Sequence, residues 1–371
     1  MVIDSDHGCC ETLRRNMREG AREAGDWDIR EQNVSDFGFT EFEDTDLLSG
    51  GPPCQPFSQG GSLSGRADPR DMLPQFIRAV RECQPKSFIL ENVKGLLHCS
   101  FFNYFNYIIH QLRFPDALRK KTERWTEHRA RLERLYTSGA GHGLKYNVIW
   151  QVLDAADFGA AQRRKRVFAV GVRSDLAIEY SFPIRTHSRE ALWADQWATG
   201  NYWERHCISR RRRPDAPRTA LQKLLSLASE ITSMSWQTVR DAIGDLPNVG
   251  VGRTSRKVLN HFLNPGARVY DGHTGSNMDA PAKAIKAGHH GVSGGENVLC
   301  LDDGTVRYFS VRECARLQTF PDHWEFEGSW CNSMRQIGNA VPVKLGAVVA
   351  MPLADALRSK LQRAGPSQDG Q

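Results

Sequence analysis

The feature that most constrains this chain is the alternation of short apolar runs with helix-like stretches in its first half. Runs with the length and the β-branched content of buried strands lie at residues 2–3, 46–49, 86–93, 147–153 and 166–172. Apolar residues recur at helical spacing at 11–24 and 72–83. Strands that alternate with helices favour a parallel sheet, so the sequence predicts an α/β fold.

The alternation does not continue along the whole chain. The charged stretch 112–134 predicts one inserted, solvent-facing helix, and after about residue 173 the periodicity disappears. Helical patterns return at 311–319 and 339–362. We therefore predict a large domain interrupted by a smaller one, with no internal repeats.

Composition excludes several classes of protein. The 371 residues are 40% hydrophobic, which supports a sizeable core, and the chain shows neither an N-terminal signal pattern nor an apolar run of about 18 residues. We expect a cytoplasmic protein without a membrane span. The nine cysteines form no C-x-x-C pair, which argues against a zinc site and a disulfide framework, so we expect reduced thiols and no metal. The net charge of +6 permits a polyanionic partner.

One cysteine stands in an unusual setting, the segment SGGPPCQPFSQGG at residues 49–61. Glycine accepts positive φ and proline fixes φ near −65°, so the two together define a backbone shape that few other sequences adopt. A lone cysteine is commonly a small buried apolar residue. In this loop, Cys54 is a candidate nucleophile as well.

Two further polar features follow or open predicted strands. Glu91 and Asn92 come directly after the apolar run KSFIL, and the basic run QRRKR opens the strand near residue 166. Taken singly, Glu91 is an exposed carboxylate at a strand end and the basic run is a solvated turn. In an open α/β sheet, however, the carboxyl ends of strands line the ligand crevice, so Cys54 and Glu91 are expected to face it.

A thiol, a carboxyl group and an arginine suit one demanding reaction. C5 of cytosine is a poor nucleophile until a thiolate adds at C6 while a carboxyl group bonds N3. An arginine near O2 orients the ring and stabilises the developing negative charge. A cytosine inside a duplex must first be flipped out of the stack.

Five segments in order resemble the DNA (cytosine-5) methyltransferase family of bacteria and phages. They are GGPPCQPFSQGG (50–61), ENVKGLL (91–97), QRRKRVF (162–168), VRECARLQTFPD (311–322) and RQIGNAVPV (335–343). The resemblance implies a Rossmann-like domain that uses S-adenosylmethionine and carries a smaller inserted target-recognition domain. It implies a catalytic domain at 1–174, a target-recognition domain at 175–305, and a return to the catalytic domain with a C-terminal helix at 306–371.

The resemblance also assigns roles to residues. The catalytic group comprises Cys54, the nucleophile, Glu91, the partner of N3, and Arg164 and Arg166, which hold the base. Supporting roles fall on Pro53, Gln55, Asn92 and Gln162. The expected S-adenosylmethionine contacts are Asp4, Asp36, Pro53, Leu73, Asn339 and Val341, and Gly338–Asn339 is expected to open the last helix beside the methionine carboxylate. The expected DNA contacts are Ser58, Arg210, Arg211, Arg212, Arg213, His290 and Arg312. The run 210–213 reads equally well as a solvated loop.

Two departures from the family pattern stand out. The family opens with a strand and an F-x-G-x-G turn about twenty residues before the acid matched by Asp4, and this segment is absent here. We therefore expect either a start set too late or a truncated copy. In both cases the present sequence is expected to bind S-adenosylmethionine weakly or not at all. Ala284 occupies the position where the family's recognition domain carries threonine.

The resemblance favours an enzyme that methylates C5 of cytosine in a short duplex DNA sequence. We expect a monomer, associated with the nucleoid when bound to DNA and partnered with a restriction endonuclease that acts on the same site. A catalytically impaired remnant that binds DNA as an accessory protein is one alternative, and an RNA cytosine-5 methyltransferase is another. The roughly 130 residues of the variable region favour DNA, since sequence readout needs a surface of its own.

Overall fold

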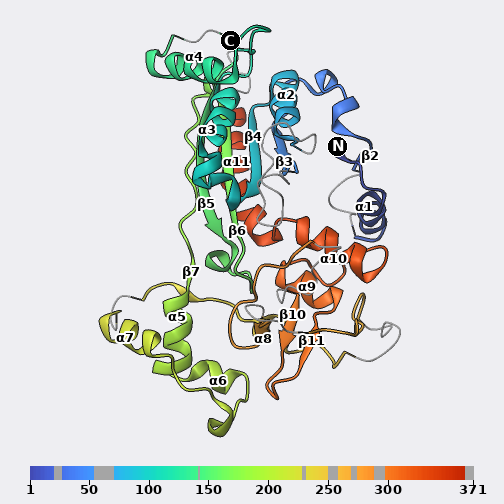
Figure 1. The fold of residues 1–371 in the computed structure, drawn as a ribbon, viewed down its shortest axis with the longest axis vertical. Coiled ribbons are helices and arrows are strands. Elements are labelled where there is room, and N and C mark those ends of the chain that lie inside the picture. Colours follow the sequence, from blue (N-terminus) through green and yellow to red (C-terminus); the bar gives the residue numbers. More distant parts are fainter. Residues whose placement is uncertain are drawn as a thin grey trace, which may run out of the picture. The chain divides into compact units, whose positions relative to one another are not determined.

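A computed structural model describes residues 1–20, 27–53, 71–140, 143–227, 231–249, 258–268, 274–287 and 297–363 (Figure 1). The chain forms two compact units. The first unit comprises Met1–Gln32, Asp154–Arg164 and Ile184–Val348. The second unit comprises Asn33–Leu153, Lys165–Pro183 and Val349–Gln371. These units divide the chain differently from the boundaries expected at 174 and 305, which stay a prediction.

The second unit contains the principal sheet. Its strands, in spatial order, are β3 (Leu47–Gly50), β4 (Ser87–Val93), β6 (Lys165–Arg173) and β5 (Tyr146–Asp154). β3 and β4 are parallel, as the sequence predicts, but β6 runs antiparallel to β4. The expected parallel arrangement is therefore confirmed for β3 and β4 and is wrong for β4 and β6. Only residues 155–164 connect β5 to β6, and a parallel crossover needs about a dozen residues or more.

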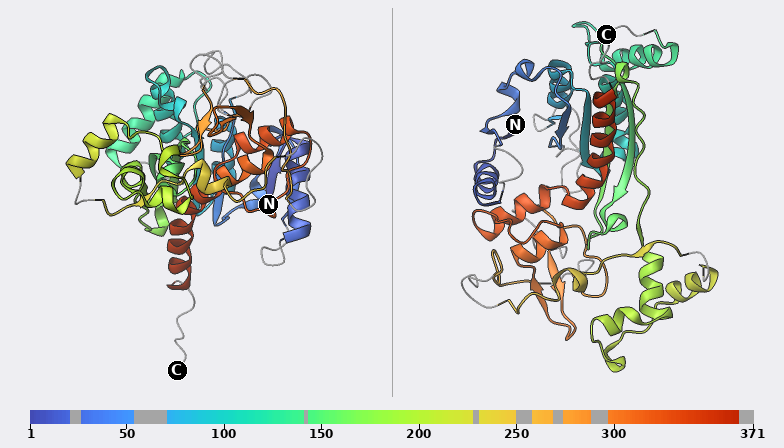
Figure 2. Two further views of the ribbon diagram at one scale, coloured as in Figure 1. Left: turned by 90° about the horizontal axis from the view of Figure 1, so that it is seen from below. Right: turned by 180° about the vertical axis from the view of Figure 1, so that it is seen from behind.

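Helices cover both faces of this sheet. Figures 1 and 2 show α3 (Cys99–Arg113) over one face and the C-terminal part of α11 (Val343–Arg363) along the other. α2 (Leu73–Cys83) packs with α3 on the sheet. The buried core between them includes Phe76, Ile77, Val80, Phe88, Leu90, Phe105, Ile108, Leu112, Val167 and Ala169. A sheet with helices on both faces is the layered arrangement of Rossmann-like domains.

The charged stretch 112–134, predicted as one helix, contains only the end of one helix and most of the next. α3 ends at Arg113 and α4 begins only at Trp125, ending at Ser138. Pro115 lies between them, and proline removes a backbone donor and disfavours helical geometry in the residue before it. α4 buries only His128 and Leu132, so the predicted solvent-facing character is confirmed for this helix.

The first unit is built from short elements. β1 (Val2–Asp4) pairs in parallel with β2 (Ile29–Glu31), and α1 (His7–Gly20) lies between them in sequence. A second small sheet has the order β11 (Val306–Tyr308), β10 (Val298–Cys300) and β9 (Ser276–Asn277), and β7 (His187–Ser188) pairs with β8 (Met234–Ser235). The helices are α5 (Arg189–Trp193), α6 (Asn201–Arg205), α7 (Arg218–Leu227), α8 (Val239–Ile243), α9 (Val311–Leu317) and α10 (Trp330–Asn339).

The last helical region is divided by a short break. α10 ends at Asn339 and α11 starts at Val343, so Gly338 and Asn339 close one helix and do not open the next. Pro342 explains the break, since it disfavours helical geometry at Val341. By length and composition alone, Trp330–Gln362 could cross a membrane, a test that core helices of soluble proteins also pass. Here the stretch buries core residues such as Met334, Ile337 and Leu353.

Candidate active site

The chain that leads into the predicted nucleophile is held by the neighbouring strand. β3 ends at Gly50 and is followed by Gly51, Pro52 and Pro53. The Asn92 Nδ2 atom on β4 donates a hydrogen bond of 3.1 Å to the Pro52 carbonyl oxygen. Cys54, Gln55 and Ser58 lie outside the described residues. The backbone two residues before Cys54 is therefore fixed by one of the predicted supporting side chains.

Glu91 lies directly against this segment. A Cβ atom placed on Gly51 would be 2.9 Å from Glu91 Oε2, so the carboxylate would have to shift to make room for any other residue there. The other carboxylate oxygen, Oε1, lies 2.9 Å from Arg166 Nε. The register of β4 and β6 places Val93 opposite Arg166, and Glu91 projects from the same face of β4 as Val93.

The Glu91–Arg166 pair is shielded from solvent. The two side chains are only 13% and 15% exposed. Burial lowers the pKa of Arg166, and the charge of Glu91 acts in the opposite direction. Arginine stays charged at neutral pH, so a buried cation and a carboxylate stand together beside the segment that leads into Cys54.

Arg164 occupies a different environment from the one expected. Its side chain is 1% exposed, and its guanidinium donates to the carbonyl oxygens of Ile285, Gly338 and Ala340 at 2.8, 2.5 and 3.1 Å. The prediction that Arg164 holds the base is corrected: in the described structure it binds backbone within the first unit. Its partners are far away in sequence, so no local pattern announces them.

Gln162 and Gln318 extend this buried network. Gln162 Oε1 accepts from the Ile285 amide at 2.8 Å, and Gln162 Nε2 donates to Gln318 Oε1 at 3.0 Å. Gln318 Nε2 donates in turn to the Ile337 carbonyl oxygen at 2.5 Å. Sequence reasoning assigned a supporting role to Gln162 and missed Gln318, whose only signal is its place in the VRECARLQTFPD segment. The network fixes the end of α10 and the break that follows it.

The expected S-adenosylmethionine contacts fall in both units. Asp4, Asn339 and Val341 belong to the first unit, and Asp36, Pro53 and Leu73 to the second. Asp4 closes β1, where an acid can bind ribose hydroxyls; its Oδ1 accepts from the Asp6 amide at 2.8 Å, and burial raises its pKa. A carboxylate in this position fits the hydroxyl groups of a nucleoside.

Three details differ from the expected cofactor set. The Leu73 side chain is fully buried in the core of the second unit, so its predicted contact with the cofactor is corrected to a packing role. Asn339 is exposed at the C-terminal end of α10, where the helix dipole is negative. The dipole there disfavours a carboxylate, and the expected helix N-terminus at Gly338–Asn339 is wrong.

Some of the residues expected to contact DNA are exposed, and others are occupied by contacts within the protein. Arg210, Arg211 and Arg212 form an exposed 3-10 turn, and Arg212 pairs with Asp302 at 3.2 Å. Arg213 donates to the Ile208 carbonyl oxygen at 3.1 Å. Arg210 and Arg211 therefore stay candidates for phosphate contacts, while Arg212 and Arg213 help to hold the turn. His290 lies outside the described residues.

Arg312 is not a surface residue. Its side chain is 0% exposed, and its guanidinium donates to the carbonyl oxygens of Leu259, Pro321 and Trp324 at 3.0, 3.2 and 2.6 Å. The prediction of a DNA contact for Arg312 is therefore wrong, because burial and three backbone partners leave this guanidinium no access to a phosphate.

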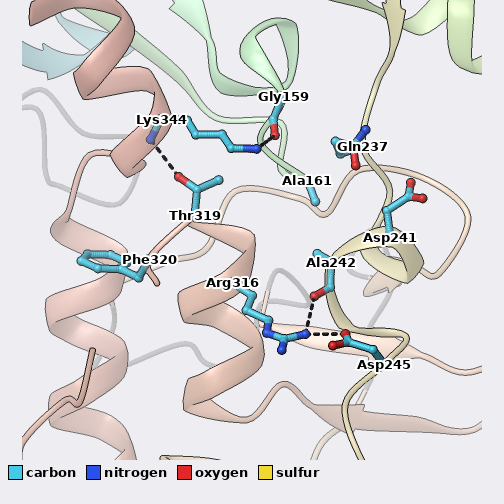
Figure 3. Close-up of a pocket in the computed structure, with 10 residues that line it drawn as sticks. All are labelled: Gly159, Ala161, Gln237, Asp241, Ala242, Asp245, Arg316, Thr319, Phe320 and Lys344. Atoms are coloured by element: carbon cyan, nitrogen blue, oxygen red, sulfur yellow. Dashed lines mark hydrogen bonds and ion pairs between the residues drawn. The ribbon is translucent and has the colours of Figure 1, made fainter. Parts of the chain in front are cut away.

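A separate pocket of about 410 Å³ lies in the first unit (Figure 3). The charged groups that line it form hydrogen bonds within its wall. Arg316 donates to Asp245 and to the Ala242 carbonyl oxygen, and Lys344 donates to the Gly159 carbonyl oxygen at 3.3 Å. Among the described residues, none of the predicted catalytic or cofactor residues lines it.

Comparison with known proteins gives a consistent result. The family model described as C-5 cytosine-specific DNA methylase matches residues 1–115 and 127–354. The chain is 29% identical over 364 residues to the Type II methyltransferase M.NgoMIV of Neisseria gonorrhoeae, covering 97% of this chain and 91% of that protein. It is 30% identical over 367 residues to the Type II methyltransferase M.Eco47II of Escherichia coli, covering 96% of this chain and 73% of that protein.

Solved structures agree on the fold. The S. pombe Dnmt2 methyltransferase has a TM-score of 0.51 at 17% identity and covers 96% of this chain and 90% of its own. The Entamoeba histolytica methyltransferase EhMeth has a TM-score of 0.52 at 12% identity, with the same coverage of 96% and 90%. With the family match over nearly the whole sequence, this chain belongs to the C-5 cytosine-specific DNA methylase family and is a DNA (cytosine-5-)-methyltransferase.

Proposed function

We propose that the chain transfers a methyl group from S-adenosylmethionine to C5 of one cytosine within a specific short duplex DNA sequence. The observation that carries the proposal is the position of the Glu91 carboxylate. It lies 2.9 Å from a Cβ position on Gly51, three residues before Cys54, and 2.9 Å from Arg166 Nε. A carboxyl group and a guanidinium thus stand beside the backbone that leads into the residue expected to be the nucleophile.

The reaction follows from these groups. The Cys54 thiolate adds to C6 of a flipped-out cytosine, and Glu91 binds N3 so that the electron pair moves towards C5. Arg166 stabilises the negative charge on the ring near O2. Asp4 and the other residues expected to contact S-adenosylmethionine would hold it; when bound, it would supply an electrophilic methyl group and leave as S-adenosylhomocysteine. After the methyl group bonds to C5, a base removes the C5 proton, the bond between Cys54 and C6 breaks, and the aromatic ring is restored.

Three other cysteines in the described part of the chain are poor candidates for the nucleophile. Burial raises the pKa of Cys9 to about 12 and that of Cys83 to about 11. Cys314 is completely buried, and burial raises its pKa well above the ordinary value. Since the thiolate is the reactive form, these three thiols are unreactive near neutral pH. These three thiols therefore do not compete with Cys54 for the role of nucleophile.

The relatives suggest the biological setting. The two curated proteins compared above are named Type II methyltransferases. We propose that this chain protects a short DNA site in the bacterial cytoplasm from a restriction endonuclease, that it acts as a monomer, and that residues 175–305 read the site. The alternatives are methylation of RNA and an accessory protein that binds DNA without modifying it.

The test is labelled methyl transfer from S-adenosylmethionine to a mixed-sequence duplex DNA and, separately, to RNA of matched sequence. We expect transfer to the duplex, dependence on a particular sequence, and complete loss of transfer in Cys54→Ser with DNA binding retained. Transfer to RNA alone would favour the RNA alternative. DNA binding with no transfer by the unaltered chain would favour the accessory role and contradict the proposal.

A further inference from the structure

The two ends of the segment that carries Cys54 are joined to each other. The Pro53 carbonyl oxygen accepts a hydrogen bond of 3.2 Å from the amide of Met72, the residue that precedes α2. Pro53 is bonded in sequence to Cys54, and Asn92 holds Pro52 at 3.1 Å. The position of the chain just before Cys54 therefore depends on the position of the start of α2.

The start of α2 is fixed by a tyrosine from another helix. The Asp71 carboxylate accepts from the Leu73 amide at 3.1 Å through Oδ1 and from the Tyr104 hydroxyl through Oδ2. Tyr104 lies on α3, and its side chain is 7% exposed. A buried hydroxyl on α3 thus binds the carboxylate that accepts from the first amide of α2.

α2 packs closely against the end of β3. A Cβ atom placed on Gly50 would be 3.0 Å from two atoms of the Phe76 ring, so the first turn of α2 and the end of β3 are in tight contact. Close-packed interiors transmit small shifts. A movement of Asp71 is therefore passed to Met72 and from there to Pro53, while β3 limits the directions in which α2 can yield.

We propose that Tyr104 is a positioning residue for methyl transfer. Its hydroxyl acts through Asp71 and Met72 on the backbone next to Cys54. The inference rests on the proposed function. It goes beyond a capping role, because a cap alone would affect the stability of α2 and leave the rate of the folded enzyme unchanged. Tyr104 touches neither the base nor the methyl donor in this account.

The first test compares Tyr104→Phe with Tyr107→Phe in the full chain. Tyr107 is the matched control: it lies on the same helix and is also 7% exposed, but its hydroxyl bonds to His128 Nδ1 at 2.8 Å. The readouts are the single-turnover rate of methyl transfer at saturating DNA, the dissociation constant for the duplex, and thermal unfolding. All rates are measured where every variant is fully folded.

We expect Tyr104→Phe to lower the single-turnover rate about tenfold, since misplacing a reacting group by about 1 Å can cost about 10²-fold. The dissociation constant for DNA should change less than about twofold, and Tyr107→Phe should lose stability without losing rate. Tyr104→Phe combined with Asp71→Ala should be no slower than Asp71→Ala alone, because both substitutions break the same link.

Hydrogen exchange gives a readout that does not depend on activity. In Tyr104→Phe the amides of residues 72–76 should exchange faster than in the unaltered chain, and in Tyr107→Phe they should not. A rate for Tyr104→Phe within about twofold of the unaltered chain, or unchanged exchange at residues 72–76, would overturn this inference and leave the proposed function standing. An unaltered chain that transfers no methyl group to any nucleic acid would overturn the proposed function, and the inference with it.

Discussion

Replacing Gly51 by alanine adds one methyl group at the most sensitive point of the candidate site. The new Cβ would stand 2.9 Å from Glu91 Oε2, whereas ordinary contact begins at 3.4 Å, so the carboxylate must retreat by about 0.5 Å. Its other oxygen is held by Arg166 at 2.9 Å, which opposes that movement. We expect the single-turnover rate to fall about tenfold, because catalytic groups tolerate displacements of this size poorly.

Stability should respond differently from activity. A change from glycine to alanine restricts the unfolded chain and contributes about 0.4–1 kcal/mol where the native backbone suits alanine. The free energy of unfolding of Gly51→Ala should therefore stay within about 1 kcal/mol of the unaltered chain. The matched control is Gly38→Ala in the same unit, since nothing lies within 4 Å of a Cβ atom at Gly38.

The assay is single-turnover transfer of a labelled methyl group to a duplex containing the recognised site, with urea unfolding measured on the same preparations. Equal rates for Gly51→Ala and Gly38→Ala would refute the placement of Glu91 against Gly51. A loss of rate that merely follows the unfolded fraction would refute it as well.

Three further predictions concern other parts of the chain. Gly338→Ala puts a Cβ atom 2.2 Å from the Ala287 amide nitrogen. Overpacking against backbone costs about 1–3 kcal/mol or more, which should exceed the gain in helix propensity of about 1 kcal/mol. Urea unfolding should therefore show net destabilisation, and an unchanged unfolding midpoint would contradict this packing. Burial lowers the pKa of His128, whose stabilising contribution is therefore complete above the unfolded pKa of about 6.5 and declines as the pH falls below it. The free energy of unfolding of His128→Gln should accordingly fall less steeply than that of the unaltered chain between about pH 6.5 and 5, and identical slopes would count against this assignment. Arg210→Ala and Arg211→Ala should each reduce the salt slope of DNA binding by about 0.9, whereas Arg212→Ala, whose side chain pairs with Asp302, should leave it unchanged.

Glu91 and Arg166 were predictable because each stands at the end of a strand that the apolar pattern already marks. Once β4 and β6 pair, their register brings the two side chains to one face, and no long-range information beyond that pairing is needed. The antiparallel direction of β6 was not accessible in the same way. The predicted strands 147–153 and 166–172 leave residues 154–165 for the connection, which a crossover could span, and the shorter connection 155–164 appears only in the structure.

Arg164 and Arg312 show where sequence reasoning stops. Both are arginines in basic or motif-like settings, and both are buried with guanidinium groups that donate to three backbone carbonyl oxygens each. Their partners come from segments far away in the chain or from loops without a pattern. The residue type alone cannot distinguish an arginine that binds a phosphate from one that ties loops together.

The break between α10 and α11 was predictable in part from the sequence. Pro342 marks a helix boundary in the sequence, so the position of the break could have been anticipated. The network that fixes it, through Gln318 and Arg164, depends on tertiary packing and is visible only in the structure. The link from Tyr104 to Asp71 is of the same kind, since the two residues are 33 positions apart and share no motif.

The most direct test of the account is to identify the covalent bond between protein and DNA. A duplex in which 5-fluorocytosine replaces the target cytosine should trap the adduct, because fluorine at C5 cannot leave as a proton does. With S-adenosylmethionine present, mass spectrometry of the digested complex should find the nucleotide attached to the peptide that contains Cys54. Cys54→Ala should form no covalent complex with the duplex. A nucleotide attached to any other residue, or methyl transfer that persists in Cys54→Ala, would contradict the assignment of Cys54 as the nucleophile.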